Sequence, residues 1–235
     1  MVLSNQPTIF GDDIVVGLSS VDDGNMRFSS GDIDEVCENR INFLRHVDID
    51  PTQATLIQVS YEDNVDFTRY HVVDDENLGE GILEHKSDLH ADALIVTHPD
   101  HALFLPLADC IGAVIYDPVA KILMVSHLGR HSIEQQGAQK SIQYLIDEFG
   151  SEVKDLKIWL SPSVGGDSYP LRDFNDRSLQ DVACGQFEQA GIGLEQIEVS
   201  DIDTAEDDNY FSHSEYLAGN QMTDGRFAII AMMRD

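Results

Sequence analysis

The sequence predicts a mixed α/β fold, of the α+β type or built from mixed α/β layers. Three observations predict it. Short apolar runs typical of strands recur along the chain, apolar residues at helical spacing recur between some of them, and the two kinds of segment do not alternate strictly. The 235 residues, 42% of them apolar, suffice for a substantial core in one large domain or two small ones. No internal repeat or flexible linker interrupts the chain.

The apolar patterns place the individual elements. Runs bounded by turn residues predict strands at 14–18, 55–61, 93–97, 102–107, 111–116, 121–126, 157–160 and 227–232. Apolar residues at helical spacing predict helices at 32–46, 133–149 and 179–190. In the second helix Ser132 and Gln135 fit a capping box, and Gly150 marks the end. The acidic segment 74–92 is expected to be a long surface loop or an insertion.

The charge balance limits the partners. The chain has 43 acidic and 14 basic residues, a net charge of -29, which repels phosphate backbones and makes nucleic acid an unexpected partner. The acidic residues are spread along the whole chain, so we interpret them as solubilising. An anionic substrate would need a local cluster of basic residues. No apolar run is long enough to span a membrane and no secretory signal is visible, so we expect a cytoplasmic protein without a membrane partner.

One predicted hairpin carries the most informative pair of residues. Its two apolar runs flank an Asp-Pro turn signal at Asp117. If Asp117 pairs with Ala120, the register places Cys110 directly opposite His127, with Cα atoms roughly 4.5–5.5 Å apart. A thiol and an imidazole so placed suit two ligands of one metal ion, or a nucleophile and its base in a metal-free Cys-His hydrolase.

The other two cysteines are expected to have structural roles. An odd count of three in a cytoplasmic protein argues against a disulfide framework. Cys37 and Cys184 lie in predicted helices and are expected to be small core residues. Cys110 differs because it follows Asp109 at the open end of the hairpin.

The segment after the hairpin is a candidate anion site. Arg130, His131 and Ser132 lie where the second helix is expected to begin, and a helix N-terminus offers unpaired backbone N–H groups and positive dipole character. We predict that these three residues bind a substrate group such as phosphate or carboxylate. An ordinary capped helix is the alternative.

Four stretches, in the same order, resemble the laccase-domain family, also called multicopper polyphenol oxidases, purine nucleoside phosphorylase-like proteins or peptidoglycan editing factors. They are Ala91-Asp92-Ala93-Leu94, Leu107-Ala108-Asp109-Cys110, Ser161-Pro162-Ser163-Val164-Gly165, and Tyr210-Phe211-Ser212-His213 together with Gly225-Arg226-Phe227-Ala228. Asn39-Arg40 and Gln58-Val59 fit as well, so the resemblance covers most of the chain.

The resemblance implies a single α/β domain over residues 1–235, with mixed β-sheets flanked by helices. It also implies a zinc ion held by two histidines and one cysteine at a surface pocket, with phosphorolysis or deamination of purine nucleosides, or editing of peptidoglycan precursors, as activities. A set of this kind suits zinc better than copper. By motif, Cys110 and His127 occupy two of the three ligand positions.

The chain departs from the family pattern at several places. The family's first histidine follows a Gln-Val pair, and here Ser60 follows Gln58-Val59. His71 is the candidate replacement ligand, with His85 and His90 as weaker ones. Arg130 stands where the family has tryptophan and His131 where it has arginine. Ser214-Glu215 stands where paired arginines are expected, so substrate contacts should be altered.

The leading hypothesis is a zinc-dependent enzyme acting on purine nucleosides or a similar small polar substrate, with phosphate as one option for a co-substrate, by phosphorolysis, deamination or hydrolysis. Cys110 and His127 are the expected catalytic centre, and Asp109 is expected to shuttle a proton, to orient a ligand or to cap the strand end. One alternative is a degenerate member that binds a ligand or partner without turnover, and another is the metal-free Cys-His hydrolase. The oligomeric state is open.

Overall fold

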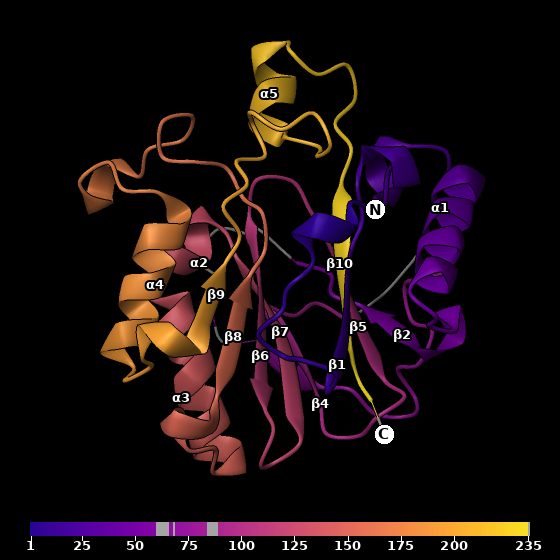
Figure 1. Cartoon of the computed structure of the whole chain (residues 1–235). Helices are drawn as coiled ribbons and strands as arrows, with labels where there is room; N and C mark the ends of the chain where they lie inside the picture. The colour runs from indigo at the N-terminus through magenta and orange to yellow at the C-terminus, as the bar shows by residue number, and fades with distance from the viewer. Residues whose placement is uncertain (60–65, 68, 84–88, 235) are drawn as a thin grey trace.

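A computed structural model describes residues 1–59, 66–67, 69–83 and 89–234 of the chain (Figure 1). Two β-sheets lie between two groups of helices, with α1 on one side and α2, α3 and α4 on the other (Figure 1). The described helices are α1 Ile33–His46, α2 Arg130–Glu134, α3 Gly137–Phe149, α4 Leu179–Gln189 and α5 His213–Ala218. The described strands are β1 Ile14–Leu18, β2 Ala54–Leu56, β3 Tyr70–Val72, β4 Ala93–Val96, β5 Ala102–Leu107, β6 Ile111–Asp117, β7 Ile122–Leu128, β8 Lys157–Leu160, β9 Ile197–Val199 and β10 Phe227–Met233.

Both sheets mix parallel and antiparallel pairs. The four-stranded sheet has the order β1-β10-β5-β2, and the six-stranded sheet has the order β3-β4-β7-β6-β8-β9. Three pairs are parallel, namely β2 with β5, β3 with β4, and β8 with β9, and the others are antiparallel. The fold class is therefore the predicted one: a single α/β domain of mixed sheets flanked by helices.

The alternation of side chains along each strand sorts the core into layers. On β7, Leu123 and Val125 point between the two sheets, whereas Ile122 and Met124 point toward α3 and α4. A third apolar layer packs α1 against the four-stranded sheet. His127 continues the series of Leu123 and Val125, so its side chain lies at the end of the layer between the sheets.

The predicted register of the β6–β7 hairpin is wrong by two residues. His127 lies opposite Gly112, not Cys110, and the last pair is Asp117 with Ile122. The turn is longer than expected because the Asp117 carboxylate accepts hydrogen bonds from the backbone N–H groups of Val119 and Ala120, both at 2.9 Å. A shift of two keeps the same face of the sheet, so Cys110 becomes the diagonal neighbour of His127.

The predicted helix 133–149 is two helices. α2 ends at Glu134, Gln136 adopts a left-handed φ of 61°, and α3 begins at Gly137. The buried side chain of Gln186, on α4, bridges the break between the two helices. It accepts a hydrogen bond from the Ala138 N–H and donates one to the carbonyl of Ile133. The Ser132–Gln135 capping box is also wrong, since the Ser132 hydroxyl accepts from Gly129 N–H. Gly150 ends α3 with φ 70°, as predicted.

The remaining predictions differ at their edges. α1 begins after Asp32, whose carboxylate caps the N–H groups of Asp34 and Glu35. The strand expected at 55–61 ends as β2 at Leu56, Gln58 forms only an isolated bridge with His90, and positions 60 and 61 lie outside the described residues. Segment 74–92 lies partly outside them as well, so its nature as an insertion stays a prediction. No helix in the described ranges is long and apolar enough to cross a membrane.

Candidate functional site

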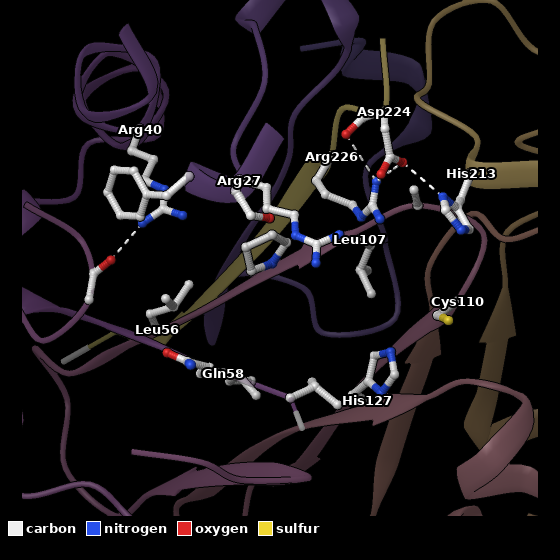
Figure 2. A pocket seen from close by; sticks show the side chains of 17 residues that line it. Arg27, Arg40, Leu56, Gln58, Leu107, Cys110, His127, His213, Asp224 and Arg226 are labelled. Carbon is white, nitrogen blue, oxygen red and sulfur yellow. Dashed lines mark hydrogen bonds and ion pairs between the residues drawn. The ribbon is translucent and has the colours of Figure 1, made fainter. Parts of the chain in front are cut away.

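A cavity of about 810 Å³ opens where β5 leads through Ala108 into Cys110, at one end of the layer between the sheets (Figure 2). Its walls combine apolar side chains from β2 and β5 with polar ones from loops far apart in the sequence. The lining residues that matter most here are Arg27, Arg40, Gln58, Cys110, His127, His213, Asp224 and Arg226.

Cys110 and His127 meet at Gly129. A Cβ placed on Gly129 would lie 2.8 Å from the Cys110 sulfur, 3.1 Å from Cε1 and 3.6 Å from Nε2 of His127. The thiol and the imidazole therefore lie against the same patch of backbone, and only glycine leaves them room. Both side chains face the cavity (Figure 2). The structure thus brings together the two residues that the sequence singled out.

His127 is held deep in the wall. The residue is 3% exposed, and its backbone N–H donates to the carbonyl of Asp92 at 2.9 Å. Burial lowers the pKa of His127 to about 4, although the charge of Asp92 acts in the opposite direction. At neutral pH the imidazole is therefore uncharged, which is the state that binds a metal ion or accepts a proton.

Asp109 lies behind Cys110 and holds neighbouring segments. It adopts a left-handed φ of 75° and is buried. One carboxylate oxygen accepts from the Thr204 hydroxyl at 2.9 Å, and the other accepts from the N–H and hydroxyl of Ser214 at 2.7 and 2.6 Å. These contacts tie the residue before Cys110 to Thr204 and to Ser214 of α5.

Three arginines gather around the cavity of this acidic chain. The Arg40 side chain is buried, donates to the carbonyls of Met26 and Gly81, and lies 4.1 Å from the centre of the Phe28 ring. Burial lowers its pKa to about 10, which still leaves it charged at neutral pH. Arg27 extends toward the middle of the cavity, and Arg226 lies beside it (Figure 2). The cavity is therefore locally basic.

A second imidazole, His213, approaches from the first turn of α5. Its Nδ1 lies 2.8 Å from Oδ1 of Asp224, and Nη1 of Arg226 lies 2.6 Å from the same oxygen. His213 is the first residue of α5, after the capping residue Ser212. The cavity therefore holds two histidines in different surroundings, one buried and one 44% exposed.

The residues predicted to bind substrate lie elsewhere. Arg130 is 61% exposed and pairs with Glu134 at 2.8 Å, and His131 lies 2.7 Å from the Gln135 amide. Ser132 is buried in the turn, where its hydroxyl donates to the carbonyl of His127. Ser132 thus holds the backbone of His127 from outside the cavity. Arg130, His131 and Ser132 do not line the cavity that the described residues form.

The candidates for a third metal ligand are scattered. His71 Nε2 lies 2.8 Å from Oδ1 of Asn77, and His90 Nε2 lies 3.5 Å from the Gln58 amide nitrogen. Ser60 and His85 lie outside the described residues. Within the described ranges no group of three or more His, Cys, Asp or Glu side chains is placed to hold a metal ion. Cys110 and His127 therefore fit zinc in kind and supply two of the three protein ligands usual at a catalytic site.

Sequence reasoning missed part of this wall. His213 and Arg226 were visible as members of the fourth family stretch, without a role. Asp224, two residues before Arg226, was not singled out, although it hydrogen-bonds both His213 and Arg226. Arg27 follows Met26 in a segment with no periodic pattern, so no local signal marks it.

The stacked sheets with outer helices, together with a thiol and an imidazole at the cavity between them, define a protein of the laccase-domain type. Residues 15–175 match the family model described as multi-copper polyphenol oxidoreductase laccase, and the chain belongs to this family. The family name associates the fold with a bound metal.

Relatives with names and structures support the same placement. The chain is 24% identical over 178 residues to a protein named purine nucleoside phosphorylase YlmD, from Bacillus subtilis. That match covers 65% of this chain and 64% of the relative, so it spans slightly less than two thirds of the relative's length. The structure of YlmD from Geobacillus stearothermophilus matches with a TM-score of 0.84 at 18% identity, over 97% of this chain and 94% of that one. The hypothetical protein YfiH from Bacillus licheniformis matches with a TM-score of 0.82 at 20% identity, over 94% and 93%. At these identities the two structures support the fold alone.

Proposed function

We propose that the protein is an enzyme that cleaves purine nucleosides, or a similar small polar substrate, by phosphorolysis in the cavity of Figure 2. The observation that carries the proposal is that Arg27, Arg40 and Arg226 line the same cavity as Cys110 and His127. In a chain with 43 acidic and only 14 basic residues, a basic cavity is suited to an anion such as phosphate. This favours phosphorolysis over deamination or hydrolysis, neither of which needs an anionic co-substrate. The name of the Bacillus subtilis relative agrees with this substrate class.

Cys110 and His127 are the residues that would hold zinc in this proposal, in preference to copper. Zinc bound there would polarise a substrate oxygen or lower the pKa of a bound water. The uncharged state of buried His127 suits ligation, and Gly129 allows the sulfur and the ring to approach the same point. Arg27 and Arg226 would orient the phosphate, and the buried charge of Arg40 would add to the positive potential.

A second candidate function is binding of a nucleoside without turnover. The observation that favours it is the pair, rather than trio, of metal-binding side chains among the described residues. The third possibility, a metal-free enzyme, would use Cys110 as nucleophile and uncharged His127 as base. The three possibilities predict different effects of a chelator and of a thiol reagent on the activity.

The test uses protein purified without added metal. The proposal expects near-stoichiometric zinc, and phosphate-dependent release of a purine base from at least one of adenosine, inosine and guanosine. Cys110→Ala should lose both zinc and activity, whereas Cys184→Ala, a matched change on α4, should keep both. Activity that survives a chelator and is abolished by iodoacetamide would favour the metal-free enzyme. Nucleoside binding by equilibrium dialysis without base release would favour the second candidate, and neither binding nor release would overturn the proposal.

A further inference from the structure

The second imidazole of the cavity, His213, is not used by the proposed zinc site. In Figure 2 its ring and that of His127 lie on either side of Cys110. The two rings come from different elements, α5 and β7, so their positions are fixed independently. His127 is buried and is assigned to the metal. His213 is 44% exposed and remains accessible to a molecule in the cavity.

The hydrogen bond to Asp224 sets the tautomer of His213. Partial burial raises the pKa of Asp224, but hydrogen bonds from Arg226 and His213 outweigh this and hold it below its usual value. The carboxylate is therefore ionised near neutral pH and can only accept hydrogen bonds. Nδ1 of His213 must then carry the hydrogen, at 2.8 Å from Oδ1. In the neutral ring this leaves Nε2 with a lone pair that can accept a proton.

The surroundings also restrict how the ring can turn. Tyr216, one turn further along α5, stacks near the ring with centroids 6.5 Å apart and planes 23° apart. The next residue, Ser214, donates two hydrogen bonds to Asp109, which precedes Cys110 in the chain. The helix that carries His213 is thus tied to the loop that carries the thiol. This is the arrangement of a base oriented by a carboxylate.

We propose that His213 is the proton-transfer residue of this cavity, oriented by Asp224 through Nδ1 and acting through Nε2. The inference rests on the proposed function. In phosphorolysis an oxygen of hydrogen phosphate forms a bond to C1′ of the sugar, and the bond from C1′ to the purine nitrogen breaks with its electron pair going to the purine. The proton of hydrogen phosphate passes to Nε2 of His213 and then to the purine nitrogen. The products are the sugar phosphate and the neutral purine, and nothing is oxidised or reduced.

The charged and titratable groups around His213 are known from the structure. Asp224 and Arg226 lie on the segment leading into β10, Tyr216 lies on α5 itself, and Arg27, Cys110 and His127 line the same cavity. A pH profile of the wild type alone would not separate the contributions of these groups to the activity. The test therefore compares variants.

The experiment measures purine release by the zinc-loaded full chain with a nucleoside and phosphate. His213→Gln should lower kcat by about 10²–10⁴-fold, the usual contribution of a positioned acid or base, while zinc content and thermal midpoint stay unchanged. KM should change by less than about threefold, because the loss concerns the transition state. Asp224→Asn should lower kcat in the same direction with a smaller loss, since the ring remains present. His46→Gln, an exposed histidine on α1, should behave as wild type.

Two further measurements distinguish a proton-transfer role of His213 from a purely structural one. The pH profile of kcat should lose its acid limb in His213→Gln and keep it in His46→Gln. NMR of ¹⁵N-labelled histidine should find His213 with its hydrogen on Nδ1 when the ring is neutral. The inference is overturned by an Nε2–H tautomer, or by an active wild type whose kcat and pH profile are unchanged in folded His213→Gln. If the wild type releases no purine, the proposed function and this inference fall together.

Discussion

The Asp109 carboxylate accepts two hydrogen bonds from Ser214, one from its backbone N–H at 2.7 Å and one from its hydroxyl at 2.6 Å. Asp109 directly precedes Cys110, and Ser214 directly follows His213. One pair of contacts therefore sets the position of the thiol relative to the second imidazole, although 105 positions separate the two residues.

Asp109→Asn tests this contact. Asparagine tolerates the left-handed backbone of residue 109 but removes the charge, so the change isolates the hydrogen bonds to Ser214 and Thr204. We expect a loss of about 1.5–3 kcal/mol in the free energy of unfolding, the range for hydrogen bonds to a charged group. Urea unfolding followed by the fluorescence of Trp159, the single tryptophan, measures it.

Thr204→Ala is the matched comparison, since it removes only the bond to the other carboxylate oxygen. It should cost about 0.5–1.5 kcal/mol. An Asp109→Asn protein that unfolds at the wild-type urea concentration would contradict the assigned role of this carboxylate.

Gly129 gives the second prediction. Its backbone is extended, with φ −94° and ψ −178°, so alanine is not strained there and any effect comes from the added Cβ. That Cβ would lie 2.8 Å from the Cys110 sulfur, closer than real contacts of this kind. We expect Gly129→Ala to displace the thiol, to lower zinc content, and to cost about 1–3 kcal/mol of stability, as overpacking usually does.

Zinc content and the rate of Cys110 labelling by a maleimide, read by mass spectrometry, check this prediction. Gly185→Ala on α4 is the control, because its Cβ would meet the Arg177 side chain at an ordinary 3.6 Å. Alanine should leave labelling unchanged there and stabilise the helix by up to about 1 kcal/mol. Equal labelling rates in Gly129→Ala and wild type would disprove the close contact.

The local patterns of the sequence predicted most of the elements but not the details that depend on single side chains. The strands at 14–18, 102–107 and 157–160 match in full, because alternating or continuous apolar runs determine them. The hairpin register failed because turn length depends on where the Asp117 carboxylate finds N–H partners. Short elements such as β3, β9 and α5 were missed, since three to six residues carry too little periodicity.

The candidate site likewise contains residues that could be predicted from the sequence and residues that could not. Cys110 and His127 could be predicted because one hairpin brings them close, and a register error of two residues keeps them on one face. Arg27, His213 and Asp224 could not, because they reach the cavity from segments about 80 to 100 residues from the hairpin in sequence and only tertiary packing joins them. Arg130 and His131 satisfied a local rule for anion binding, yet Arg130 pairs with Glu134 and His131 with Gln135, and neither lines the cavity that the described residues form.

Gln186 gives the third prediction. Its buried amide bridges the gap between α2 and α3, accepting from Ala138 at 3.2 Å and donating to Ile133 at 2.8 Å. Gln186→Leu has a similar volume and leaves the Ala138 N–H buried without this partner, whereas the Ile133 carbonyl keeps its hydrogen bond from the Gln136 N–H at 3.0 Å. We expect a loss of about 1–3 kcal/mol, the cost of one unsatisfied buried group. Gln143→Leu, on the exposed face of α3, should change stability by less than about 0.5 kcal/mol. Similar urea midpoints for the two variants would refute the bridging role.

The pH dependence of stability gives the last prediction. Burial holds the pKa of His127 at about 4, below the ordinary value of 6.5 that applies in the unfolded chain. Between pH 6.5 and 4 the unfolded chain therefore binds a proton that the folded protein excludes, so this residue makes stability fall as the pH falls. Over that window the loss is roughly 3 kcal/mol, at about 1.4 kcal/mol for each pH unit.

Many carboxylates titrate in the same range, so the quantity to measure is the difference in unfolding free energy between wild type and His127→Gln. Measured with a chelator present, because a bound metal adds its own pH dependence, that difference should shift in favour of the variant as the pH falls from 7 to 4. His46→Gln, which removes an exposed imidazole on α1, is the control variant. A wild-type minus His127→Gln difference that is flat between pH 7 and 4 would mean that the buried imidazole accepts its proton as readily as it does in water.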